Sequence, residues 1–200
     1  MMDQQEMQRP EEKQGFSRAI LDYLQDFSYM VAGILLVFLL FFRIAAVDGS
    51  SMYPTLHHGD RLFLLSNLLH PKFTQGDVVV VHERDFAQDY SLVKRVIAVE
   101  GQTVDIDFEE GIVYIDGIPQ QEPYVNTPTN LEEGVTFPVT VPSNCVFVMG
   151  DNRNHSKDSR DPEVGFVDQR EIFGKAVAVY LPGRDSETGK MDYSRIGVIR

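Results

Sequence analysis

A long uncharged run near the N-terminus constrains this chain more than any other feature. Residues 27–42 read FSYMVAGILLVFLLFF, and beyond Arg43 the apolar character continues to Val47. As a helix, residues 27–47 would span roughly 31 Å, close to the hydrocarbon thickness of a bilayer. Apolar side chains would surround this helix on every side, so we expect a transmembrane helix over residues 27–47. Arg43 has a stem long enough to carry its charge to the headgroups.

Two other interpretations of this run are a buried core helix and a cleaved signal peptide. A signal peptide would need a basic leader and a small-residue cleavage site. Residues 1–26 instead contain three basic side chains against six acidic ones. We therefore interpret residues 1–26 as a retained cytoplasmic segment. The count of basic residues on the two sides of the run favours a cytoplasmic N-terminus only slightly.

The composition excludes some classes of function. The chain has 18 Lys and Arg against 30 Asp and Glu, a net charge of −12. This argues against a nucleic acid partner, because phosphate binding requires clustered basic residues. The single cysteine, Cys145, excludes an intramolecular disulfide and any site built from several cysteines.

After residue 47 the pattern changes to short β-type runs separated by Gly, Pro and Asp, which predicts a mainly β domain over residues 48–182. A short helix is expected near Asp168–Phe173, and Pro138 demotes its run to an edge strand or a bulge. The polar residues 183–200 are expected to form a mobile C-terminal tail. The expected strands are Arg61–Leu65, Val78–His82, Leu92–Val99, Thr103–Phe108, Ile112–Ile115, Val135–Val141, Val146–Met149 and Lys175–Tyr180.

The common catalytic and nucleotide-binding motifs are absent from the sequence. It contains no HExxH, P-loop, GxGxxG or GxSxG pattern. His57 and His58 are adjacent, but neighbouring side chains of an extended segment point to opposite faces and chelate poorly. We therefore expect no metal site.

Residues 92–99 read LVKRVIAV and place two cations in an apolar strand. In a period of two, Lys94 shares a face with Val96, whereas Arg95 shares one with Val93. Both faces are apolar, so at least one cation is expected against apolar surroundings. Burial lowers the pKa of a lysine, and a neutral lysine can act as a general base. On the pattern alone, a lysine that extends from an edge strand into solvent is the more ordinary interpretation.

Two polar stretches have unusual local composition. Residues 49–56 read GSSMYPTL and follow the apolar run directly, and residues 150–160 read GDNRNHSKDSR. Taken separately, they are typical of a juxtamembrane linker and of a loop that satisfies its own hydrogen bonds.

Together these segments resemble the bacterial type I signal peptidases, the membrane-anchored Ser–Lys proteases of protein export, in the short form of Gram-positive bacteria. Residues 51–56 match the nucleophile motif of that family, and residues 76–81 (GDVVVV) match its next strand. Residues 94–97 match the general-base motif, and residues 150–160 match the last motif. The order and spacing agree over roughly residues 30–180, which makes chance similarity an unlikely explanation.

The resemblance implies that Ser51 is the nucleophile and that Lys94 is the general base. A neutral lysine can replace the usual histidine only in a dry pocket that keeps it uncharged. Ser156 matches the hydroxyl that orients the lysine amine. The other supporting residues implied are Asp158, Arg160, Asp151 and Arg95.

The sequence departs from the family pattern at two places. Some members have a serine two positions before the nucleophile, where this chain has Gly49. We therefore expect the Ser51 amide to be the first oxyanion donor, with the Ser50 hydroxyl or a Gly49 contact as alternatives. The interval between the lysine motif and the last motif is also short, which implies a small insert subdomain at about residues 103–141.

The resemblance implies a single-pass protein of the cell membrane, with its catalytic domain on the extracytoplasmic side. It would remove signal peptides from pre-proteins after a small residue, with no metal or cofactor. An extended substrate would lie beside the strands of the site. The candidate pocket walls are Val47, Met52, Leu92 and Val93. The rival interpretations are a self-cleaving Ser–Lys protease of the repressor type, which would need a basic helical module, and an inactive tethered β-domain that binds exported chains.

Overall fold

The computed structural model describes residues 9–68, 72–82, 91–184 and 188–199, in two units that divide between residues 40 and 41. Among the described residues, the first unit consists of helix α1 (Arg9–Phe41) without its last residue. Within it, Arg18–Phe41 is long and apolar enough to cross a membrane by length and composition. Of the expected cytoplasmic segment, residues 1–8 lie outside the described residues.

The helix ends earlier than the sequence predicts. It stops at Phe41, and Phe42–Ala46 form strand β1, which pairs antiparallel with β2 (Arg61–Ser66). The expected helix over residues 27–47 is therefore wrong at its C-terminal end. An apolar run can continue from a helix into a strand without any change in hydropathy, and only the register with β2, Phe42 opposite Leu65 and Ala46 opposite Arg61, separates the two.

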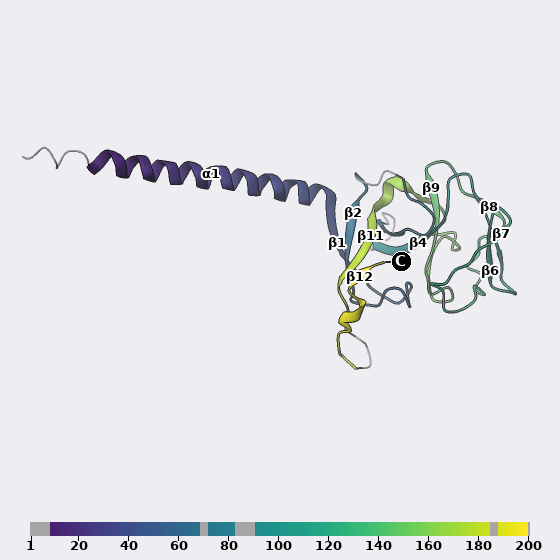
Figure 1. Ribbon diagram of the computed structural model, residues 1–200. Coiled ribbons are helices and arrows are strands. Elements are labelled where there is room, and N and C mark those ends of the chain that lie inside the picture. The colour runs from purple at the N-terminus through teal and green to yellow at the C-terminus, as the bar shows by residue number, and fades with distance from the viewer. Residues whose placement is uncertain (1–8, 69–71, 83–90, 185–187, 200) are drawn as a thin grey trace, which may run out of the picture. The chain divides into compact units, whose positions relative to one another are not determined.

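The second unit is built on an antiparallel sheet of eight strands (Figure 1). Its order is β1-β2-β11-β3-β4-β9-β10, and β12 pairs with β11. The strands beyond β1 and β2 are β3 (Val78–His82), β4 (Ser91–Val99), β9 (Cys145–Met149), β10 (Val167–Asp168), β11 (Ile172–Leu181) and β12 (Gly197–Val198). The mainly β fold is thus confirmed.

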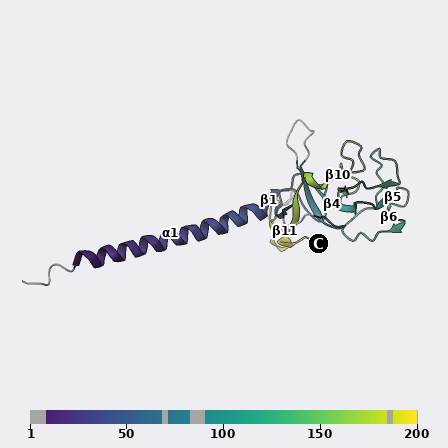
Figure 2. The same cartoon turned by 90° about the horizontal axis from the view of Figure 1, so that it is seen from above.

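A second, four-stranded sheet forms the small insert. It comprises β5 (Thr103–Asp107), β6 (Ile112–Ile115), β7 (Ile118–Pro119) and β8 (Val139–Thr140), in the order β7-β6-β5-β8. Both views place this sheet at the end of the β domain away from β1 and β11 (Figures 1 and 2). The strand expected over Val135–Val141 is reduced to β8, which begins directly after Pro138, a residue without an N–H to donate.

Three apolar clusters hold the β domain together. The first contains Val47, Met52 and Val93, and the second packs β4 and β9 against the small sheet. The third lies on the other side of β3 and β4 and includes Val79 and Val96. Six consecutive residues of β4, 93–98, are buried, so this strand is a fixed support for the side chains it carries.

The C-terminal residues differ from the expected mobile tail. The 3-10 helix η2 (Tyr193–Arg195) precedes β12, and β12 pairs with β11 through Val198 opposite Ala178. Arg195 makes an ion pair with the fully buried Asp60. A buried carboxylate needs a cation and donors around it, which is why this polar segment is held to the domain. A second 3-10 helix, η1 (Gln169–Glu171), lies where the short helix was expected.

Candidate active site

The structure brings Ser51 and Lys94 into direct contact. The Lys94 Nζ donates a hydrogen bond of 2.8 Å to the Ser51 Oγ, although the residues are 43 positions apart. Lys94 lies in the buried part of β4 and is only 2% exposed. A lysine amine against a serine hydroxyl, away from water, is a geometry in which the amine can accept the hydroxyl proton when neutral.

Ser51 is held on a compact turn. The Tyr53 N–H donates to the Ser50 carbonyl (3.0 Å), and the Leu56 N–H donates to the Met52 carbonyl (2.8 Å). Met52 and Leu56 are completely buried in the first cluster. Two apolar anchors within six residues therefore fix a turn that would otherwise be a polar linker.

The second polar stretch, residues 150–160, closes on this turn. The Asn152 N–H donates to the Ser51 carbonyl (2.9 Å), and the Asn152 side chain donates to the Ser50 carbonyl (3.1 Å). A Cβ on Gly150 would lie 2.5 Å from the Ser51 carbonyl oxygen and 2.2 Å from the Ser156 Oγ. The two motifs thus touch through their backbones, with no room for a side chain at Gly150.

Ser156, Asp158 and Arg160 form a buried wall within the same loop. The Ser156 hydroxyl donates to Asp158 Oδ2 (2.8 Å), and Arg160 donates to both oxygens of that carboxylate (2.9 Å each). Glu133 packs beside them, 3.3 Å from an Arg160 nitrogen. Burial and the charge of Asp158 raise the pKa of Glu133 to about 7, against the opposing effect of Arg160.

Arg95 and Asp151 form the other half of the support. The Arg95 guanidinium donates to Asp151 Oδ1 at 2.8 Å and to Oδ2 at 2.7 Å, a bidentate pair that is almost completely buried. The Thr55 hydroxyl donates to the same carboxylate at 2.5 Å. Arg95 is the neighbour of Lys94 on β4, and Thr55 lies on the same turn as Ser51. Asp151 therefore connects the strand that carries Lys94 to the turn that carries Ser51.

The expected oxyanion donors are not equivalent. Gly49 has a φ of +91°, which favours glycine, and its N–H donates to His58 Nδ1 (3.2 Å). Within the described part of the chain, the Ser51 N–H donates no hydrogen bond to the protein. The Gly49 amide is therefore engaged, and Ser50 contributes its carbonyl to the turn.

The candidate pocket walls separate into two groups. Val47, Met52 and Val93 are buried together in the first cluster, which Ala45 also contacts. Leu92 packs against the third cluster instead. Adjacent residues of a strand point to opposite faces, which explains why Leu92 and Val93 do not share a pocket.

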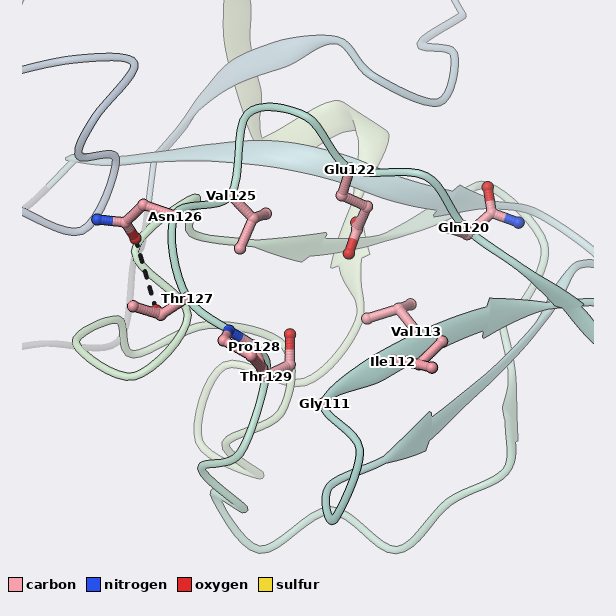
Figure 3. Close-up of a pocket in the computed structure, with 10 residues that line it drawn as sticks. All are labelled: Gly111, Ile112, Val113, Gln120, Glu122, Val125, Asn126, Thr127, Pro128 and Thr129. Carbon is pink, nitrogen blue, oxygen red and sulfur yellow. Dashed lines mark hydrogen bonds between the residues drawn. The ribbon is translucent and has the colours of Figure 1, made fainter.

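The described cavities lie outside this constellation. One of about 290 Å³ is bounded by the 120–129 loop and the start of β6 (Figure 3). Among the residues that the structure describes, no three His, Cys, Asp or Glu side chains gather in a way that could hold a metal ion.

Several residues of the site were not identified from the sequence. Thr55 and Asn152 lie inside the two motifs, and their side chains were not assigned roles. Glu122 receives two hydrogen bonds from the buried Arg153, at 2.6 and 2.7 Å. No local pattern marks this pair, because its members are 31 positions apart.

Comparison with known proteins finds relatives over most of the chain. The family model for signal peptidase, peptidase S26, matches residues 20–181. A probable signal peptidase I-1 of Synechocystis is 42% identical over 163 residues, which cover 76% of this chain and 79% of that one. Signal peptidase I S of Bacillus subtilis is 34% identical over 174 residues, covering 82% of this chain and 91% of that one. A signal peptidase I crystal structure from Enterococcus faecalis aligns over 52% of this chain and 96% of that chain, with 29% identity and a TM-score of 0.42.

The matches define the class first: this is a peptidase, a hydrolase of peptide bonds. The chain belongs to the signal peptidase family, peptidase S26. The family resemblance expected from the four motifs is confirmed.

Proposed function

We propose that this chain is a membrane-bound serine endopeptidase that removes N-terminal signal peptides from exported pre-proteins, with Ser51 as nucleophile and Lys94 as general base. The observation that carries the proposal is the 2.8 Å hydrogen bond between Lys94 Nζ and Ser51 Oγ, formed by a lysine that is 2% exposed. A serine hydroxyl is a weak nucleophile at neutral pH unless a neighbouring base takes its proton.

The reaction follows from this contact. The neutral Lys94 amine accepts the proton of Ser51 Oγ, which attacks the scissile carbonyl carbon. The Lys94 ammonium then protonates the leaving amine, and the mature protein departs with a free N-terminus. The signal peptide remains as an ester on Ser51. Water, deprotonated by Lys94, hydrolyses this ester and regenerates the free hydroxyl.

Two groups around Ser51 support these steps. The Ser51 N–H is the first donor for the negative oxygen of the tetrahedral intermediate, and each such donor contributes about 10²–10³ in rate. The Ser156 hydroxyl donates its proton to Asp158. Its oxygen can therefore accept a hydrogen bond from another donor. That polarity suits an oxygen that orients the Lys94 amine.

Val47, Met52 and Val93 are the proposed apolar surface for the small side chains of the substrate. The apolar helix over Arg18–Phe41 is the proposed membrane anchor, with a cytoplasmic N-terminus and the β domain on the outer face. An extended substrate leaving the bilayer would then reach Ser51 by pairing with strand edges.

Cleavage of a signal-peptide-bearing precursor by the full chain in lipid vesicles tests this proposal. The wild type should release the mature protein, and Ser51→Ala should release none while keeping its circular dichroism spectrum. Tyr53→Ala, a change of an exposed side chain on the same turn, is the control for damage to the turn. Equal cleavage by Ser51→Ala would overturn the proposal, and absence of cleavage by the wild type would favour a binding domain.

A further inference from the structure

The 122–124 segment, Glu-Pro-Tyr, lies in the loop that follows β7 and makes contacts that the proposed mechanism does not use. The Tyr124 hydroxyl donates to Glu122 Oε1 (2.9 Å), and the Tyr124 ring lies under the Arg95 guanidinium, with the Cζ atom 4.0 Å from the ring centroid. Figure 3 shows the Glu122 side chain projecting from this loop into the pocket beside β6. The Glu122 carboxylate accepts hydrogen bonds from both terminal nitrogens of Arg153.

The 122–124 segment contacts two arginines, Arg95 and Arg153. These arginines bind consecutive residues of the 150–160 loop. Arg95 binds the Asp151 carboxylate through two hydrogen bonds. Arg153 donates through its Nε to the Gly150 carbonyl (3.1 Å). The side chains of both arginines are at most 2% exposed. A buried cation keeps one position only while its partners surround it. The 122–124 segment supplies one side of that surround for both guanidinium groups, together with the Gly76 carbonyl at Arg95 and the Thr129 hydroxyl at Arg153, each at 2.9 Å.

A displacement of residues 150–151 would also move Ser51 and Ser156, because both lie in direct contact with Gly150. The Cα of Gly150 is packed so closely against Ser156 and the Ser51 carbonyl that a methyl group would not fit. Asp151 also accepts a hydrogen bond from the hydroxyl of Thr55, which lies on the Ser51 turn. Close-packed contacts of this kind transmit small shifts without absorbing them.

We propose that Glu122 and Tyr124 are positioning residues that hold the Gly150–Asp151 peptide, and through it Ser51 and Ser156, in the arrangement that catalysis requires. The inference rests on the function proposed above. Burial and the Glu122 carboxylate raise the pKa of Tyr124 above its usual range, so its hydroxyl remains a donor at neutral pH. Neither side chain belongs to the apolar cluster of Val47, Met52 and Val93, so their effect should fall on kcat and not on KM.

Two variants that preserve volume test the inference: Glu122→Gln removes the charge, and Tyr124→Phe removes the hydroxyl but keeps the ring under Arg95. With the full chain in detergent and a peptide carrying alanine at the first and third positions before the bond, we expect Glu122→Gln to lower kcat about tenfold, and Tyr124→Phe about threefold. KM should stay within about twofold for both. Asn130→Ala is the matched control, because Asn130 lies in the same loop but bonds the Phe108 carbonyl (2.8 Å); its kcat should stay within about twofold of the wild type.

The outcomes separate this inference from the proposed function. Ser51→Ala is measured in the same assay, and if the wild type shows no Ser51-dependent cleavage, the proposed function itself fails. If cleavage depends on Ser51 but Glu122→Gln retains kcat within about twofold, the positioning role is overturned. Failure of both variants to fold, or a kcat that falls only in step with the folded fraction, would also overturn it, since the segment would then serve stability alone.

Discussion

At the scale of single residues, Gly150 is the point where the Ser51 turn and the 150–160 loop meet. Any side chain there would overlap Ser156 Oγ at 2.2 Å and the Ser51 carbonyl at 2.5 Å. We predict that Gly150→Ala lowers kcat by about 100-fold, because shifts of an ångström at reacting groups have effects of that size. Gly33→Ala, where a Cβ meets no atom within 4 Å, should leave kcat unchanged. Steady-state kinetics of the two folded variants would decide, and normal kcat in Gly150→Ala would contradict the proposed geometry.

Glu133 should give the wall of the site a dependence on pH. Burial and the neighbouring Asp158 raise its pKa from 4.5 to about 7. The native state then holds a proton that the unfolded chain has already lost, so the contribution of Glu133 to stability falls as the pH rises from 4.5 to 7.

Urea unfolding of Glu133→Gln and wild type at pH 4.5 and pH 8 measures this effect. The wild type should lose free energy of unfolding relative to the variant between the two values, because glutamine resembles the protonated acid and does not titrate. Glu132→Gln, with an exposed side chain, is the control. A difference between wild type and Glu133→Gln that is the same at both pH values would contradict the predicted pKa.

The individual residues differ in how far the sequence could identify them. Ser51 and Lys94 stand in motifs whose order carries information, and the structure places them in contact. Leu92 could not be separated from Val93 without knowing which face of β4 meets which cluster. Glu122 needed the fold, because its partner Arg153 comes from a different loop.

At the scale of elements, Asp60 joins the Ser51 turn to the C-terminal segment. Its buried carboxylate accepts the His57 N–H and the Gly183 N–H, both at 2.8 Å, and pairs with Arg195. We predict that Asp60→Ala lowers the free energy of unfolding by about 3–5 kcal/mol, since it leaves these donors buried without their acceptor.

Denaturant unfolding of Asp60→Ala and Asp48→Ala gives the comparison. The Asp48 side chain is 85% exposed, and surface carboxylates of this kind contribute about 0–1 kcal/mol. Equal effects of the two substitutions would show that the C-terminal segment is not anchored through Asp60.

The strands were more predictable than the segments that join them. Val78–His82 and Ile112–Ile115 have the expected bounds, because a run of β-branched residues between turn signals leaves little choice. The boundary between α1 and β1 was missed, since both sides are apolar and only pairing with β2 distinguishes them. The ordered C-terminal strand was missed because its anchor, Asp60, is distant in the sequence.

At the scale of the whole molecule, the chain combines an apolar helix with a β domain whose interior contains an unusual set of charges. Lys94, Arg95, Arg153 and Arg160 are each at most 2% exposed. Three of them are matched by the carboxylates of Asp151, Glu122 and Asp158. Lys94 donates to the Ser51 hydroxyl at 2.8 Å. In the proposed mechanism this contact performs the chemistry, and the arginine pairs support it.

Site-specific acylation is the most direct test of this assignment. The full chain is treated with an acylating serine-protease inhibitor, digested, and mapped by mass spectrometry as a function of time. We predict that the label appears on the peptide containing Ser51, and that Lys94→Met slows its appearance by about 10²–10⁴-fold while the protein remains folded. Labelling of Ser51 at the wild-type rate in Lys94→Met, or labelling only at another residue, would contradict the Ser51–Lys94 mechanism.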